Sequence, residues 1–360
     1  MKKAIFIMAI IILGGIGIYL FKGYEETVSV CVTGLQYDIV YEREAQMETI
    51  QEKVAMIKAE QEEEMRRLAE LYKPKKNEHA TLSVPTHITQ VEGLYVILDC
   101  YHNQVIFNDN LVEPLTEWKV MISDLNRPHT LASDGEIYVI DDTDNHQLVV
   151  MKRVEAEGME PTFAMTQEVE GVGNRPHYTI YHEESGIFYV WSSQNGEMYL
   201  FKRKEGIDEI ELKEIKRIPE LCESYVRSFT IIDDCIYFVS GNNNVIEADL
   251  ESFAVLEYWP VVPEIGGMVQ MNRIQSYYYI TVSTDSYGNA ACATMIRTAD
   301  LATLGTGEYE VIYDLFEATG TPYYMIQMDE SWYLTHHKAG TQIWKFEIVD
   351  DVISNIEAVY

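Results

Sequence analysis

The chain has 360 residues, of which 47% are hydrophobic, so it is long enough for one large domain or two ordinary domains with a sizeable core. Its 58 acidic and 27 basic side chains give a formal net charge of −31. Such a surface repels phosphate backbones and argues against a nucleic-acid partner. The five cysteines are scattered without C-x-x-C spacing, which indicates neither a zinc knuckle nor a redox motif.

The first segment, residues 1–23, reads MKKAIFIMAIIILGGIGIYLFKG. Two lysines precede an uncharged run from Ala4 to Phe21, which reaches the lower end of the length that spans a bilayer as a helix. A signal peptide is the alternative, but its apolar core is usually shorter and is followed by a small-residue cleavage site. We therefore predict a single transmembrane helix that stays attached as a signal anchor. Lysines before the run and glutamates after it predict a cytoplasmic N-terminus and an extracytoplasmic remainder at the cell membrane.

A short linker, residues 24–37, leads to a charged segment at residues 38–74 that contains no glycine and, before Pro74, no proline. Its apolar residues recur at intervals of three and four, with polar residues in the middle of the seam, which predicts a long amphipathic, coiled-coil-like helix. These apolar residues are Met47, Ile50, Val54, Ile57, Leu68 and Leu71. The helix is either a solvated stalk or a surface for self-association through residues 38–72.

After a linker or ring-closing strand at residues 75–84, the pattern from residue 85 to residue 360 alternates with a period of two, as in antiparallel sheets. Six similar runs align on a tyrosine and recur 42 to 54 residues apart, the length of one four-stranded propeller blade. The aligned tyrosines are Tyr95, Tyr138, Tyr189, Tyr237, Tyr279 and Tyr333. A single blade cannot bury both faces of its sheet, whereas a closed ring can. The sequence therefore predicts an all-β fold, a six-bladed β-propeller.

The tetrapeptide NRPH occurs twice, at Asn126–His129 and at Asn174–His177. Both copies stand at the start of a blade, where proline needs no donor for the sheet, so the repetition is at least partly architectural. Equivalent positions in other blades also carry basic or aromatic residues. If the first strands line a central channel, these side chains converge on one mouth: Arg127, His129, Arg175, His177, Arg227 and Tyr323, with His87 at the corresponding place in the first blade.

The stretch NRPHTLASDGEIYVIDDTDNHQLVVM, Asn126–Met151, resembles an NHL-type repeat, and Asn174–Phe201 resembles it less closely. NHL propellers include binding modules and enzymes, so the resemblance implies a fold more than an activity. The Pro-His pairs are also similar to those of the peptidylglycine amidating lyases, whose histidines hold zinc. That resemblance implies His87, His129 and His177 as metal ligands, although here they belong to consecutive blades rather than alternate ones.

Three interpretations of this mouth stay open: structural polar residues, an anion site built on the arginines, or a bound zinc or calcium ion. The first choice for function is a non-catalytic binding or interaction module at the cell envelope, with an envelope protein or a small anionic ligand as partner. The alternative is a metal-dependent lyase or hydrolase of NHL-propeller type, and a structural role through the charged helix is the third. His336 and His337 are predicted to lie in a turn. The DDTDN stretch that begins at Asp141 lacks the glycine and glutamate of a calcium loop.

Overall fold

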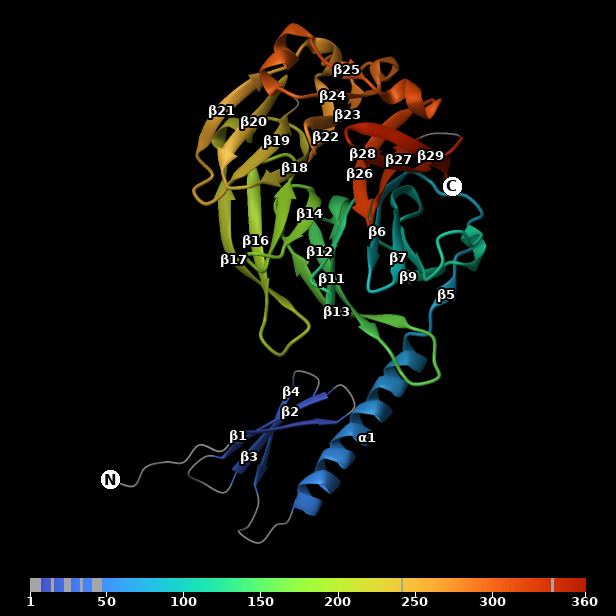
Figure 1. Cartoon of the computed structure of the whole chain (residues 1–360), viewed down its shortest axis with the longest axis vertical. Coiled ribbons are helices and arrows are strands. Elements are labelled where there is room, and N and C mark those ends of the chain that lie inside the picture. The colour runs from blue at the N-terminus through green and yellow to red at the C-terminus, as the bar shows by residue number, and fades with distance from the viewer. Residues whose placement is uncertain are drawn as a thin grey trace, which may run out of the picture. The chain divides into compact units, whose positions relative to one another are not determined.

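A computed structural model describes residues 8–13, 16–22, 27–32, 35–40, 47–240, 242–337 and 340–360. The chain divides into two compact units. The smaller unit comprises Met1–Lys73 with two short loop segments, Val154–Thr162 and Glu205–Ile207, and the larger unit comprises the rest of the chain from Pro74 to Tyr360 (Figure 1).

The smaller unit contains a four-stranded antiparallel sheet in the order β1-β2-β3-β4. The strands are β1 (Met8–Leu13), β2 (Ile16–Lys22), β3 (Thr27–Val32) and β4 (Leu35–Val40). The predicted transmembrane helix is therefore not what the structure has, because the described residues of that segment are strands. Isoleucine is frequent there and favours extended backbone, and the pairing of Leu13 with Ile16 leaves only two residues, both glycine, between β1 and β2. Among the described residues, no helix is both long and apolar enough to cross a membrane.

The charged helix exists but is shorter than predicted. Helix α1 spans Met47–Leu71, whereas residues 38–40 belong to β4 and the predicted linker at 24–37 contains β3. Val54 and Ala69 are buried, while Leu71 is exposed although it belongs to the predicted seam. Self-association through this helix stays a prediction.

The larger unit consists of six antiparallel sheets, as predicted, and the four strands of each blade follow one another in sequential order, with β5 added beside β9 in the first sheet. The first sheet contains β6 (Pro85–Val91), β7 (Leu94–Asp99), β8 (Gln104–Asn108), β9 (Lys119–Ile122) and, at its outer edge, β5 (Lys75–Lys76). The second contains β10 (Leu131–Ser133), β11 (Ile137–Asp142), β12 (Gln147–Val154) and β13 (Thr162–Glu170), and the third β14 (Pro176–His182), β15 (Ile187–Ser192), β16 (Glu197–Arg203) and β17 (Ile210–Arg217).

The other three sheets have the same organisation. The fourth contains β18 (Val226–Ile232), β19 (Cys235–Ser240), β20 (Asn244–Asp249) and β21 (Val255–Pro260). The fifth contains β22 (Gly267–Ile274), β23 (Tyr277–Thr284), β24 (Thr294–Thr298) and β25 (Glu310–Val311), and the sixth β26 (Thr321–Met328), β27 (Ser331–His337), β28 (Ile343–Val349) and β29 (Val352–Ala358). Short 3-10 helices connect several strands: Cys100–His102, Leu115–Glu117, Thr143–Asn145, Pro219–Leu221, Pro263–Ile265, Ala290–Cys292, Leu301–Thr306 and Tyr313–Phe316.

The first strands of the six sheets contact one another in turn around a closed ring, β6 to β10, β14, β18, β22, β26 and back to β6 (Figure 1). They are therefore the innermost strands, and all of them start at the same end of the channel. All six predicted tyrosines lie in the second strands, and apolar clusters fill the spaces between neighbouring sheets. A six-bladed propeller of four-stranded blades is thus confirmed.

Ring closure differs from the prediction for residues 75–84. The only strand found there, β5, pairs with β9 at the outer edge of the first sheet. Closure instead joins the sixth sheet to the first, where the Thr335 hydroxyl donates a hydrogen bond to the Thr86 carbonyl at 3.0 Å. The C-terminal stretch supplies β29 as the outer strand of the sixth sheet, as predicted. Cys222 and Cys235 are both free thiols.

Candidate functional site

The two NRPH copies position their arginines by a shared backbone arrangement. Arg127 and Arg175 adopt left-handed conformations with φ of 56° and 65°, which is uncommon for residues with a side chain. Each backbone N–H is held by the preceding blade: that of Arg127 donates to Asn103 Oδ1 at 3.1 Å, and that of Arg175 donates to His146 Nδ1 at 3.0 Å. The repetition of the motif is therefore a repeated contact between neighbouring blades.

His177, at the start of β14, is fully buried and takes part in hydrogen bonds at both ring nitrogens. Its Nδ1 lies 3.0 Å from the Arg227 carbonyl oxygen and 3.2 Å from the Tyr324 hydroxyl. Its Nε2 lies 3.1 Å from the Tyr225 hydroxyl and 3.4 Å from that of Tyr323. A carbonyl can only accept, so Nδ1 carries the proton and Nε2 accepts from a phenol. The ring is thereby fixed as a neutral imidazole.

His129 lies against His177, with ring centroids 3.9 Å apart and planes tilted by 30°. Its Nδ1 is 2.9 Å from the Thr143 hydroxyl, which in turn donates to Asp141 at 3.1 Å. The backbone N–H groups of His129 and Thr130 also donate to the Asp141 carboxylate, at 2.7 and 2.9 Å. Asp141 therefore organises the start of the second blade rather than a calcium loop.

The group formed by His129, His177, Tyr323 and Tyr324, here called the polar plug, is uncharged at neutral pH. Burial lowers the pKa of His129 to about 3, and the nearby charge of Arg175 adds to this effect. Burial also lowers the pKa of His177 well below its usual value. It raises the pKa of both tyrosines well above theirs. The plug fills this end of the channel with neutral, hydrogen-bonded rings.

Three arginines from consecutive blades, Arg127, Arg175 and Arg227, lie around the plug and are here called the basic mouth. Asp144 pairs with two of them, at 3.3 Å from Arg127 and 3.2 Å from Arg175. The Arg227 guanidinium lies 4.9 Å from the centre of the Tyr225 ring. Among the described residues, Asp144 is the carboxylate that pairs with these guanidiniums, and the Nε of Arg175 is buried without a hydrogen-bond partner.

The three histidines predicted as metal ligands are not brought together. His87 Nδ1 accepts a hydrogen bond from the Leu131 backbone N–H at 3.4 Å, and burial lowers its pKa to about 4. His129 and His177 lie face to face, so their lone pairs do not converge on one point as metal ligands must. Nowhere among the described residues do three or more His, Cys, Asp or Glu side chains form a group that could hold a metal. The structure thus gives the predicted zinc or calcium site no support.

Two residues of the mouth escaped the sequence prediction. Tyr324 contacts His177, and His337 stacks on Tyr323 with ring centroids 4.2 Å apart. His336 and His337 end β27 rather than lying in a turn. They face opposite sides, because His336 is buried against Tyr313. In the sixth sheet Thr321 pairs with His337, which places this histidine at the end where the first strand starts, and no sequence pattern indicated this.

Comparison with known proteins agrees with the fold. No family model and no curated protein matches the chain. Two solved structures that carry the provisional name 6-phosphogluconolactonase are similar in fold. The one from Bacteroides uniformis is 10% identical with a TM-score of 0.54, and the match covers 77% of this chain and 85% of that one. The one from Bacteroides fragilis is 11% identical with a TM-score of 0.54, and the match covers 75% of this chain and 82% of that one. At such identities the likeness concerns the propeller alone.

Proposed function

We propose that this protein is a non-catalytic binding module whose basic mouth takes up a small carboxylate or phosphate anion. The observation that carries the proposal is the convergence of Arg127, Arg175 and Arg227 above an uncharged plug, in a chain whose formal net charge is −31. Elsewhere an acidic surface repels anions, so a local positive charge directs them to this end of the channel.

The chemistry of the mouth favours binding over catalysis. A general base must reach its substrate with a suitable pKa, whereas both imidazoles of the plug are buried and His177 already uses both nitrogens. Guanidinium groups instead offer planar pairs of donors that match carboxylate and phosphate oxygens. The partnerless Nε of Arg175 is one donor that a ligand would satisfy.

Asp144 gives the proposal a sharp internal test, because it competes with any ligand for Arg127 and Arg175. Removing its charge with Asp144→Asn should strengthen anion binding about three- to tenfold. Arg175→Gln should weaken it about tenfold or more, since a hydrogen bond to a charged group contributes about 1.5–3 kcal/mol.

The experiment is a calorimetric titration of the full chain with sulfate and with succinate. Arg273→Gln serves as the matched control, because this exposed arginine at the far end of β22 bonds only its own turn and lies over Tyr278. Tighter anion binding by Asp144→Asn and weaker binding by Arg175→Gln, with unchanged affinity for the control, would support anion binding at the basic mouth. Equal losses for Arg175→Gln and Arg273→Gln would indicate a diffuse charge effect and overturn the proposal.

Location is a separate proposal, supported only by the composition of residues 1–23: an apolar run that follows two lysines. We propose that this segment attaches the chain to the cell membrane with the propeller outside, facing an envelope partner. Alkaline extraction of membranes from cells that express the full chain should leave it in the pellet, and external protease should digest the propeller. Release of the chain by alkali, or protection from external protease, would contradict this.

Self-association through α1 is likewise a proposal, supported by its spaced apolar residues. Sedimentation of the full chain and of Leu71→Glu would test it, because Leu71 is a seam residue that is exposed in the single chain. An unchanged sedimentation coefficient for the variant would argue against helix-mediated assembly.

A further inference from the structure

The opposite end of the channel carries an open pocket that is distinct from the basic mouth. Its volume is about 450 Å³, and it lies where β14, β18 and β22 end. Its lining residues are Tyr178, Ile180, His182, Glu184, Phe229, Thr230, Ile231, Asp233 and Asn272. Arg175 and Arg227 stand at the starts of β14 and β18, whereas Glu184 and Asp233 follow the ends of these strands. The innermost part of the pocket reaches the plug, because the Tyr178 and Tyr324 ring centroids are 5.1 Å apart.

The inner surface of the pocket is apolar and well defined. The rings of Tyr178 and Phe229 meet edge to face, with centroids 5.4 Å apart, and Ile180 and Ile231 are half-buried beside them in the same apolar cluster. Such a surface suits the hydrocarbon part of a ligand, and the two aromatic rings also favour a nearby cation.

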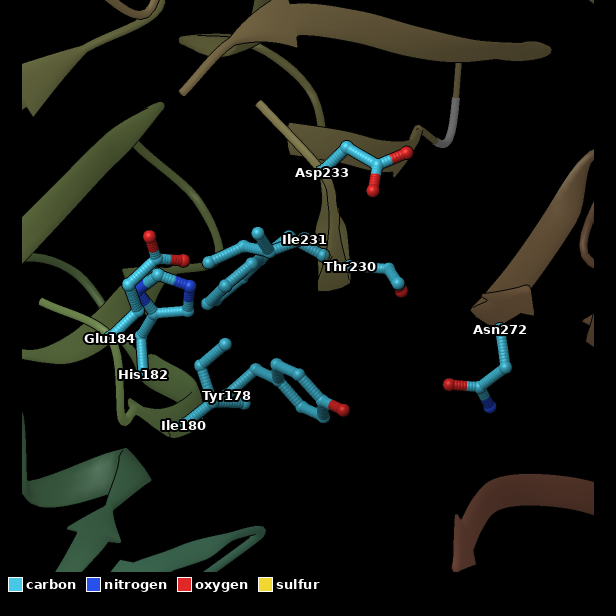
Figure 2. A pocket seen from close by; sticks show the side chains of 9 residues that line it. Tyr178, Ile180, His182, Glu184, Thr230, Ile231, Asp233 and Asn272 are labelled. Atoms are coloured by element: carbon cyan, nitrogen blue, oxygen red, sulfur yellow. The ribbon is translucent and has the colours of Figure 1, made fainter. Parts of the chain in front are cut away.

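The polar groups around this apolar surface offer both acceptors and donors, and Tyr178, whose hydroxyl oxygen accepts from Gln270 Nε2 at 3.0 Å, keeps its own O–H as a donor. Figure 2 shows the polar ends of Tyr178, Thr230 and Asn272 directed toward the same open space. The Thr230 hydroxyl already donates to the Met271 carbonyl, and Asn272 Nδ2 donates to the Met325 carbonyl at 3.3 Å. The hydroxyl oxygen of Thr230 and the Oδ1 of Asn272 remain as acceptors for a ligand that donates hydrogen bonds, and the second N–H of Asn272 Nδ2 remains as a donor.

Two carboxylates complete the edge of the pocket. Glu184 and Asp233 are exposed, and across the described part of the chain neither forms an ion pair with a basic side chain. Figure 2 places Glu184 beside His182 and Asp233 at the end of the neighbouring inner strand. Their negative charge is complementary to a cation and repels an anion.

We infer that this pocket is a second binding site, for a small organic ammonium ion with an apolar or aromatic body. The ligand body would lie on Tyr178, Phe229, Ile180 and Ile231, and its ammonium group would face the acceptor oxygens and the two carboxylates. The inference does not depend on the anion site, which lies at the other end of the channel.

Benzylammonium and its uncharged counterpart benzyl alcohol are suitable probes, titrated into the full chain at physiological ionic strength. The ammonium should bind at least about fivefold more tightly than the alcohol, because both share the aromatic contact and only one is charged. Glu184→Gln and Asp233→Asn should each weaken benzylammonium about two- to fourfold and leave benzyl alcohol unchanged. Ile231→Ser should weaken both probes.

The adjacent acidic residues provide matched controls. Glu183 and Asp234 are also exposed but do not line the pocket, so Glu183→Gln and Asp234→Asn should change benzylammonium affinity by less than about 1.5-fold. The inference fails if benzylammonium shows no saturable binding, if the two probes bind equally, or if the control variants weaken binding as much as the lining variants do.

Discussion

At one end of the channel three arginines lie around a buried cluster of imidazoles and phenols, whereas at the other end two carboxylates flank an open pocket with an aromatic surface. Both ends are built from the same inner strands, β14 and β18. Arg175 and Arg227 stand at the starts of these strands and belong to the basic mouth, whereas Glu184 and Asp233 follow their ends and line the pocket. The same inner strands can therefore carry basic residues at one end and acidic residues at the other, because the polar plug fills the channel between them.

The largest expected effect is an acid sensitivity that arises at the basic end. Four histidines lie there, and burial lowers the pKa of each, to about 3 for His129, to about 4 for His87 and His336, and well below the usual value for His177. The unfolded chain binds these protons near pH 6.5, so stability falls as the pH falls below that value. Asp141 opposes this, because its pKa is raised to about 7 and the folded chain holds its proton as the pH falls from about 7 to about 4.

Four histidines outweigh one aspartate, so the free energy of unfolding should fall by on the order of 5 kcal/mol between pH 7 and pH 5. Urea unfolding at several pH values would measure it. His129→Gln should flatten the profile, since it removes one of the titrating groups. A profile that is flat for the unaltered chain would show that the plug is not buried as described.

The next effect compares two substitutions in the same strand, His177→Ala in the plug and Ile180→Ala in the pocket. Loss of His177 leaves a buried carbonyl and several phenol hydroxyls without their partner, and should destabilise the fold by about 3 kcal/mol. Ile180 is only half-buried, so its truncation should cost about 1–2 kcal/mol. Chemical unfolding of both variants measures the difference. Equal costs would mean that the plug is no more tightly organised than the pocket.

The smallest expected effect is that a substitution in one site leaves the ligand affinity of the other site unchanged. Arg175→Gln should leave benzylammonium affinity unchanged within about 1.5-fold, and Glu184→Gln should do the same for sulfate. Charges separated by more than a Debye length, about 8 Å at physiological ionic strength, are largely screened. Titration of each variant with the other site's probe tests this, and a larger change would indicate communication through the plug.

Much of the fold was predictable because it repeats. The tyrosines of the second strands, such as Tyr138 and Tyr279, recur at blade length, and their burial between neighbouring sheets is what the pattern reflects. Residues 8–13 and 16–22 form strands where a transmembrane helix was predicted, because hydrophobicity alone does not distinguish a membrane helix from paired strands. The isoleucines of these two strands suit extended backbone as well as they suit a bilayer.

The sites were predicted less well. The repeated NRPH motif correctly indicated two equivalent positions in neighbouring blades. Nothing in the sequence indicated that Asp144 contacts Arg175 or that His337 contacts Tyr323. The metal site stays a prediction, and the Leu131 backbone N–H donates to His87 Nδ1, which occupies one of its ring nitrogens. Side-chain direction at a strand end depends on its neighbours in the ring, and these belong to another blade.

By itself, the sequence determined a repeating all-β architecture of six blades, an acidic surface and the placement of basic residues at blade starts, because strand period and repeat length are local properties of the chain. The tertiary structure alone shows that the rings of His129 and His177 stack and that Asp144 pairs with both Arg127 and Arg175. It also shows that the strand ends leave an open pocket flanked by two carboxylates. Those outcomes depend on which side chains from different blades meet, and ring closure sets that geometry.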